Sequence, residues 1–172
     1  EATEEVRVAA SQKNIRLKVV GPSEYRPIVG ARRRLRQVLS NLLANAVKFS
    51  PEGSTVTLSA QDEPDALVLE VRDEGIGILP QDQEHVFDDF FRGSNVEEVG
   101  GTGLGLSITK KIVDAHEGQI AIESPYATGV SGTRVVVRIP RTLSLPKDRS
   151  SANLQADRAS RQPAAEGERQ GT

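Results

Sequence analysis

Polar residues recur at helical spacing between Arg32 and Phe49. At about 100° per residue they fall on one stripe of a helix, next to a stripe of leucine and alanine that would pack on a sheet. The polar stripe comprises Gln37, Asn41, Asn45 and Lys48. Carboxamide oxygens are hard, neutral ligands that suit a Mg²⁺ ion otherwise held by phosphates, and a lysine one turn away can pair with those phosphates. Taken alone, however, two asparagines on an amphipathic helix are more simply interpreted as solvated.

A first glycine-bearing turn, DEGIGI, offers a second kind of chemistry. Asp73 stands at the end of a predicted strand, and Gly75 and Gly77 can adopt positive φ and let the backbone approach a flat ligand. The carboxylate can then accept a hydrogen bond from an exocyclic amine such as that of adenine. This would give base specificity, because an unpaired buried acceptor is costly. As an isolated string, the same pattern also serves ordinary turns.

A second turn, GGTGLGL, precedes and enters a predicted helix. The free amides and the dipole of a helix N-terminus suit phosphate oxygens. Gly103 and Gly105 would each cost the helix about 1 kcal/mol relative to alanine, which argues against a purely structural origin. The segment is neither a P-loop nor a Rossmann fingerprint, because no GK[ST] follows and the strand-to-helix context with a downstream acid is missing.

The hydrophobic pattern predicts the elements that must position these residues. Helices are expected over residues 1–13, 32–49, 81–92 and 104–115, and strands over residues 15–20, 55–60, 67–71, 119–123 and 133–139. Residues 15–20 alternate apolar and polar side chains as a half-buried strand does, and residues 94–101 are expected to form a mobile loop. Helices and strands mix without strict alternation, which favours a two-layer α/β sandwich with a mixed sheet over a doubly wound sheet.

Composition restricts the class of protein. The 172 residues allow one domain and a tail, and the polar composition after Pro140 predicts a domain over residues 1–140 and a disordered tail over residues 141–172. With only 3% aromatic residues, the core must be aliphatic, and without cysteine there is no thiolate metal site. A net charge of -2 gives no global attraction to nucleic acid or to an anionic membrane. The chain begins at Glu1 and contains no methionine, so we expect it to be a piece of a longer protein.

The order NLLANAVKFS, DEGIGI, VFDDFFRG, GGTGLGLSI and GTRVVVRIP resembles the N, G1, F, G2 and G3 boxes of the histidine-kinase ATPase family, also called the Bergerat or GHKL fold. The resemblance covers residues 1–140 nearly end to end. It implies a two-layer α/β sandwich with a mixed, mainly antiparallel sheet of about five strands, covered on one face by about three helices. It also implies ATP and Mg²⁺ as cofactors.

Within this resemblance, Asn45 corresponds to the Mg²⁺ ligand and Asp73 to the adenine-binding acid. The catalytic residues that it implies are Asn41 and Lys48, near the phosphates, and Arg92, which in some members reaches the γ-phosphate. Further residues that it places at the nucleotide are Phe49, Gly75, Gly77, Ile78, Gly101, Thr102, Gly103, Leu104, Gly105, Leu106 and Thr133. One departure from the family is Ala31, which stands where an aspartate usually caps the following helix, so we expect a missing cap at a cost of about 1 kcal/mol.

The implied function is that of the ATP-binding catalytic domain of a two-component sensor histidine kinase, which donates the γ-phosphoryl group of Mg-ATP to a histidine. In hydrolytic relatives a glutamate at the position of Asn41 prepares a water molecule, whereas an asparagine has no basic lone pair, so we expect slow hydrolysis. Neither His85 nor His116 has the sequence context of the acceptor, which we expect on a dimerisation hairpin before Glu1. The fragment should then be a cytoplasmic monomer that binds ATP without phosphorylating itself. Its expected partners are that hairpin and the receiver domain of a response regulator, with no nucleic acid and no direct membrane contact.

Two other functions share this fold. A serine kinase of the anti-sigma-factor type also lacks the acceptor hairpin and acts on a bound partner protein. A noncatalytic module would use ATP only to change a partner contact. The boxes NLLANAVKFS and GGTGLGLSI are closer to those of sensor kinases.

Overall fold

The computed structural model describes residues 2–96, 100–126 and 131–142. Its helices are α1 (Ala2–Gln12), α2 (Arg32–Phe49) and α3 (Gly105–Ala115), with a short 3₁₀ helix η1 (Pro80–Asp82). Its strands are β1 (Arg16–Val20), β2 (Thr55–Asp62), β3 (Ala66–Arg72), β4 (Gln119–Glu123) and β5 (Arg134–Pro140). They form one sheet in the order β1-β2-β3-β5-β4, in which β1 is parallel to β2 and the other neighbouring pairs are antiparallel. The predicted mixed, mainly antiparallel sheet is confirmed.

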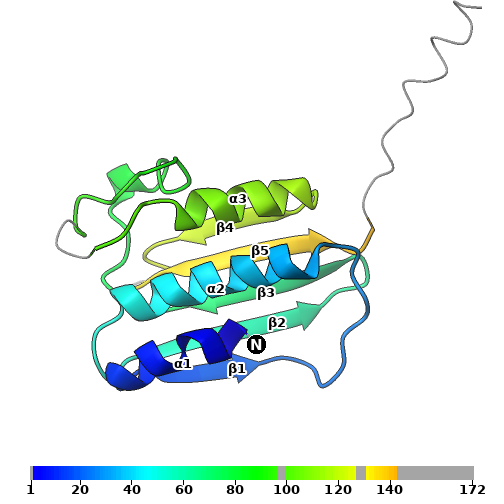
Figure 1. Cartoon of the computed structure of the whole chain (residues 1–172), viewed down its shortest axis with the longest axis horizontal. Coiled ribbons are helices and arrows are strands. Elements are labelled where there is room, and N and C mark those ends of the chain that lie inside the picture. Colours follow the sequence, from blue (N-terminus) through cyan, green and yellow to red (C-terminus); the bar gives the residue numbers. More distant parts are fainter. Residues whose placement is uncertain (1, 97–99, 127–130, 143–172) are drawn as a thin grey trace, which may run out of the picture.

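The three helices lie on one face of this sheet, which confirms the two-layer arrangement (Figure 1). Alternation along each strand sends one set of side chains toward the helices. In β5, for example, Val135, Val137 and Ile139 are buried, and the residues between them are only partly buried. Val38 and Leu43 of α2 are almost completely buried against this set. The core is aliphatic, as the scarcity of aromatic residues requires.

Helix α2 has the predicted bounds, and its two ends are held by distant side chains. At the amino end, Ala31 makes no side-chain cap, as expected. Its backbone N–H instead donates to Nε2 of His116 (3.0 Å), and Nδ1 of the same ring lies 2.7 Å from the carbonyl oxygen of Ile112. At the carboxyl end, the ammonium group of Lys13 donates to the carbonyl oxygens of Val47, Lys48 and Ser50. These carbonyls would otherwise be left unpaired where the helix ends.

The predicted helix over residues 81–92 is wrong. Beyond η1 the chain forms successive turns, in which the N–H groups of His85, Asp88 and Phe91 each bond to the carbonyl oxygen three residues earlier. Phe90 has a φ of 65° and is 72% exposed, so it cannot continue a right-handed helix. The apolar residues of this segment are spaced like a helical face, but Val86 and Phe91 line a cavity from a turn conformation instead.

Strand β1 is less buried than its alternation predicts. Leu17 packs against the core, whereas Val19 is 64% exposed because β1 is an edge strand. Strand β4 has the predicted bounds, and the remaining elements differ from theirs by one or two residues: β2 continues to Asp62, and α3 begins at Gly105. Within the described ranges, no helix is long and apolar enough to cross a membrane.

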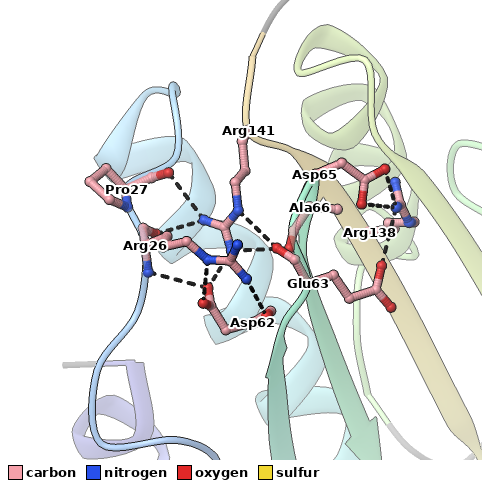
Figure 2. Close-up of polar contacts among 8 residues, drawn as sticks. All are labelled: Arg26, Pro27, Asp62, Glu63, Asp65, Ala66, Arg138 and Arg141. Carbon is pink, nitrogen blue, oxygen red and sulfur yellow. Dashed lines mark hydrogen bonds and ion pairs between the residues drawn. The ribbon is translucent and has the colours of Figure 1, made fainter.

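Arg141 joins three segments at the amino end of α2 (Figure 2). Its guanidinium group pairs with the carboxylate of Asp62 and donates to the carbonyl oxygens of Arg26 (2.7 Å) and Glu63 (2.9 Å). Two more carbonyl oxygens, those of Pro27 and Ala66, accept from the same group. All five N–H donors of this side chain are therefore engaged. Arg141 lies one residue past the predicted domain boundary, and residues 143–172 of the predicted tail lie outside the described residues.

Candidate functional site

A cavity of about 320 Å³ opens at the carboxyl end of α2, between this helix, the sheet and the segments that follow β3 and precede α3. Most of the residues that the sequence singled out line it: Asn45, Lys48, Phe49, Asp73, Gly77, Ile78, Arg92, Gly101, Thr102, Gly103, Gly105, Leu106 and Thr133. Three do not line it: Asn41, Gly75 and Leu104. The fold thus brings together residues from five separate stretches of the chain.

Helix α2 supplies one wall of the cavity. Leu42, Asn45, Ala46 and Phe49 recur at steps of three and four residues, so one face of the helix points inward. Lys48 borders this face, with its ammonium group 4.7 Å from the centre of the Phe49 ring. Burial, with a smaller effect from the nearby Arg92 guanidinium, lowers the pKa of Lys48 below its ordinary value. Two cations thus face one cavity, which favours an anionic ligand.

Asp73 is a buried acid at the end of β3, and it is only 8% exposed. Its Oδ1 accepts the backbone N–H groups of Gly75 (2.8 Å) and Thr133 (3.1 Å). Burial raises the pKa of Asp73, and these two amides oppose that rise. Since Oδ1 already serves two donors, Oδ2 is the oxygen that Asp73 can offer to a ligand in the cavity.

The glycine turn before α3 approaches other backbone closely. Gly103 has a φ of 71°, and a Cβ atom there would lie 2.6 Å from the carbonyl carbon of Phe90 and from the carbonyl oxygen of Phe91. Only glycine fits this position without moving backbone. Gly105 is the first residue of α3, and a Cβ atom there would lie 3.8 Å from Nδ2 of Asn45. The amides at the start of α3 therefore lie beside the polar face of α2.

A sequence model of the histidine kinase-, DNA gyrase B- and HSP90-like ATPases matches residues 30–143 of this chain. The chain belongs to this ATPase family. The matched range contains every residue that lines the cavity. Binding of ATP follows from membership of this family.

Sensor histidine kinases are among the similar proteins. SenX3 of Mycobacterium tuberculosis is 39% identical over 135 residues, which make up 77% of this chain and 33% of that protein. WalK of Bacillus subtilis is 45% identical over 104 residues, 58% of this chain and 17% of that protein. The chain therefore spans no more than about a third of the length of these relatives.

Solved structures agree with this assignment. The mycobacterial sensor histidine kinase MprB has a TM-score of 0.68 and 29% identity, covering 81% of this chain and 92% of that one. The catalytic domain of histidine kinase ThkA has a TM-score of 0.71 and 28% identity, covering 83% and 90%. The chain is thus an ATP-binding catalytic domain of the sensor histidine kinase type.

In this ATPase domain, Asn41 lies away from the cavity lining. Its amide nitrogen donates to the carbonyl oxygen of Gly105 (3.1 Å) and to the hydroxyl of Thr109 (3.3 Å). Asn41 and Asn45 share a stripe of α2, but Asn41 is one turn further from the carboxyl end and contacts α3 instead. The side chain therefore connects the two helices that flank the phosphate-binding turn predicted from the sequence.

The sequence did not single out the apolar walls of the cavity. The apolar walls are formed by Leu42, Ala46, Val71, Val86, Phe91, Ile122 and Val135. The short segment after Arg92 adds Gly93, Asn95 and Val96. Aliphatic residues that line a cavity have the same composition and periodicity as core residues. A signal existed for two of them, because Val71 and Val135 lie two residues from Asp73 and Thr133 and so share a face of the sheet with them.

Proposed function

We propose that this domain holds Mg-ATP in the cavity and donates its γ-phosphoryl group to a histidine on a dimerisation hairpin outside this chain. One observation carries the proposal. Asp73, a buried acid with one oxygen bound to two backbone amides, lines the same cavity as the cations Lys48 and Arg92. A base-reading acceptor and phosphate-pairing cations in one cavity suit a nucleoside triphosphate.

The nucleobase would lie near the buried end of β3. Oδ2 of Asp73 would accept the exocyclic amine of adenine, and Phe49 and Ile78 would contact the flat base. A buried carboxylate discriminates against bases that lack this amine, because it would then be left unpaired.

The phosphates would lie between α2 and the start of α3. Lys48 and Arg92 would offset their charge, and the turn from Gly101 to Gly105, with Thr102 and Leu104, would present backbone amides at a helix N-terminus. Positioning and charge are the main requirements here, since this domain itself forms no covalent bond to the phosphoryl group that moves to the acceptor histidine.

Mg²⁺ fits the donors in the cavity, with Asn45 as its protein ligand through the carboxamide oxygen. Among the described residues, no group of three or more His, Cys, Asp or Glu side chains could hold a metal ion without help. A cation bound by one carboxamide needs phosphate oxygens and water as its other ligands, which is the usual mode of Mg²⁺. When bound, the ion would neutralise charge on the phosphates.

Slow hydrolysis is expected of this domain. Asn41 carries an amide in place of a base, and its nitrogen is already engaged with Gly105 and Thr109. Water in the cavity would therefore find no general base at this position, so that ATP persists until an acceptor arrives.

The partners we infer are the acceptor hairpin of the same parent protein and a response regulator. A solved structure contains ThkA in complex with the response regulator protein TrrA, and ThkA is 26% identical to this chain with a TM-score of 0.67. We place the domain in the cytoplasm, where ATP is available, and expect it to be monomeric by itself.

Two measurements test the proposal. Calorimetry should detect ATP binding that weakens strongly when EDTA removes Mg²⁺ or when Asn45 is changed to Ala. Incubation with the parent's acceptor hairpin, produced separately, and γ-labelled ATP should then yield an acid-labile, alkali-stable phosphate on a histidine. Serine phosphate, or no transfer despite tight ATP binding, would contradict the histidine kinase assignment.

A further inference from the structure

Ser124 lies directly after β4 and is only 6% exposed. Its hydroxyl accepts the backbone N–H of Ile78 at 2.8 Å and donates to the carbonyl oxygen of Gly132 at 2.8 Å. It does not itself line the cavity. One side chain thus connects two turns that are far apart in sequence, and both turns lead to residues of the nucleotide site.

In the first of these turns, both the backbone N–H and the backbone carbonyl oxygen of Ile78 form hydrogen bonds to side chains. The Ile78 N–H is bound by Ser124, and the Ile78 carbonyl oxygen accepts from the side-chain amide of Gln83 at 3.3 Å. The same amide of Gln83 donates to the carbonyl oxygen of Ser124. Gly77, just before Ile78, has a φ of 74°, and a Cβ atom there would lie 2.9 Å from the Ser124 hydroxyl. The turn that carries Ile78 is therefore packed directly on Ser124.

The second turn packs on Asp73. Gly132 has a φ of 131°, and a Cβ atom there would lie 2.2 Å from the carbonyl oxygen of Asp73. The next residue, Thr133, donates its backbone N–H to Oδ1 of Asp73 at 3.1 Å. A shift of Gly132 would therefore move a donor that orients the Asp73 carboxylate.

We propose that Ser124 is a positioning residue for nucleobase recognition, which fixes Asp73 and Ile78 relative to each other through the two turns. The inference rests on the proposed function, in which Asp73 accepts the amine of adenine. A serine hydroxyl serves here as donor and acceptor at once, and alanine can be neither. Replacement by alanine leaves a partly buried N–H and a buried carbonyl oxygen without their partner, so both turns can relax.

The test compares ligands that share the phosphates but differ in the base. We expect Ser124→Ala to weaken Mg-ATP binding by about tenfold, from the loss of the two hydrogen bonds. Binding of Mg-ITP, which has no exocyclic amine, and of tripolyphosphate should change by less than about twofold, so the preference for ATP over ITP falls. Ser124→Thr retains the hydroxyl and should restore part of this preference. Ser54→Ala is the matched control, because Ser54 is buried to a similar degree and donates only to the carbonyl oxygen of Pro51, outside the cavity.

Amide exchange supplies a second readout. Ser124→Ala should accelerate exchange at Ile78 and leave Ile76, whose N–H donates to the carbonyl oxygen of Phe49, unchanged. If the alanine variant does not fold, Ser124→Cys serves the same comparison, because a thiol has nearly the shape of the hydroxyl but forms weaker hydrogen bonds.

Three results would overturn the inference. The first is an unchanged preference for ATP over ITP, and the second is an equal loss of affinity for all three ligands, which indicates a merely structural role. The third is an Ile78 exchange rate that does not respond to the substitution. Absence of ATP binding by the unmodified domain would overturn the proposed function itself, whereas normal binding with unchanged discrimination overturns only the role of Ser124.

Discussion

Oδ1 of Asp73 accepts the backbone N–H of Thr133, sixty residues further along the chain, at 3.1 Å. It also accepts the N–H of Gly75, two residues away, at 2.8 Å. One bond is local, and the other depends on the pairing of β3 with β5. Together they orient a buried carboxylate and leave its second oxygen for a ligand.

Asp73→Asn should separate folding from base recognition. The asparagine oxygen can take the place of Oδ1 and keep both backbone bonds, while the amide nitrogen, a donor, replaces Oδ2. A donor opposite the amine of adenine is unfavourable, so we expect Mg-ATP affinity to fall by at least about tenfold in calorimetry. Asp65→Asn is the control, because Asp65 is exposed and pairs with Arg138 far from the cavity. Unchanged affinity in Asp73→Asn would show that this acid does not read the base.

The pH dependence of binding should report the raised pKa of Asp73. As the pH falls, this buried carboxyl takes up a proton earlier than an ordinary aspartate, so ATP affinity should decline at a higher pH than for an exposed acid. The same shift adds stability that is fully present below the unfolded pKa and is lost as the pH rises through the folded pKa. Calorimetry checks the direction in which ATP affinity changes with pH, and denaturation checks the direction in which stability changes, each with Asp73→Asn for comparison. Identical pH profiles for the two proteins would contradict the prediction.

Lys48 should lose its charge below the ordinary range for lysine, because burial and then Arg92 lower its pKa. We therefore expect the affinity for Mg-ATP to fall as the pH rises through this lowered pKa. Lys48→Met should weaken binding by about tenfold or more at neutral pH, the usual effect of losing a charged hydrogen-bond donor. Lys48→Arg keeps its charge at high pH and should show no such decline. An equally steep decline in the arginine variant would assign the titration to another group.

Lys13 should stabilise the carboxyl end of α2. Its ammonium donates to the carbonyl oxygens of Val47, Lys48 and Ser50 at 3.0, 2.9 and 2.6 Å. Lys13→Met retains the apolar stem and removes the donors, so the free energy of unfolding should fall by about 2 kcal/mol in urea denaturation. Lys18→Met, on the exposed side of β1, is the control and should have little effect. A loss no larger than that of the control would mean that water replaces the ammonium without cost.

Arg141 and Arg138 allow a matched comparison (Figure 2). The Arg141 side chain is 11% exposed and donates mainly to backbone carbonyls, whereas Arg138 is 36% exposed and pairs with the carboxylates of Glu63 and Asp65. Arg141→Ala should lower Tm by about 5 °C or more, and Arg138→Ala by less than about 2 °C. Both should bind Mg-ATP normally, because neither residue lines the cavity. Equal Tm values for the two variants would contradict the anchoring role of Arg141.

The lowered pKa of Asp62 is part of the same cluster. The hydrogen bond from Arg26 is its first cause, and Arg141 adds to it. Because the folded pKa lies below the unfolded value, this contribution is present above the unfolded pKa and is lost as the pH falls through the folded pKa.

Patterns within one long element could be predicted from the sequence. The bounds of α2 follow from eighteen residues of consistent amphipathic spacing. Asn45 and Lys48 line the cavity, and they lie on the predicted polar stripe that borders the buried one. Short segments were less predictable. Residues 81–92 carry aromatic side chains at helical spacing, yet they form turns in which Phe90 is 72% exposed. So few residues cannot stabilise a helix alone.

The sequence by itself determined the boxes, their order, the aliphatic composition of the core and the amphipathic face of α2, because these depend on neighbours along the chain. Only the tertiary structure decided that Asn41 bonds to Gly105 and Thr109 while Asn45, one turn later, faces the cavity. It likewise decided that Thr133 orients Asp73 and that Ser124 connects the turns around them. All of these contacts except that between Ser124 and Gly132 join residues that are dozens of positions apart. They exist only after the strands pair and the helices pack on them.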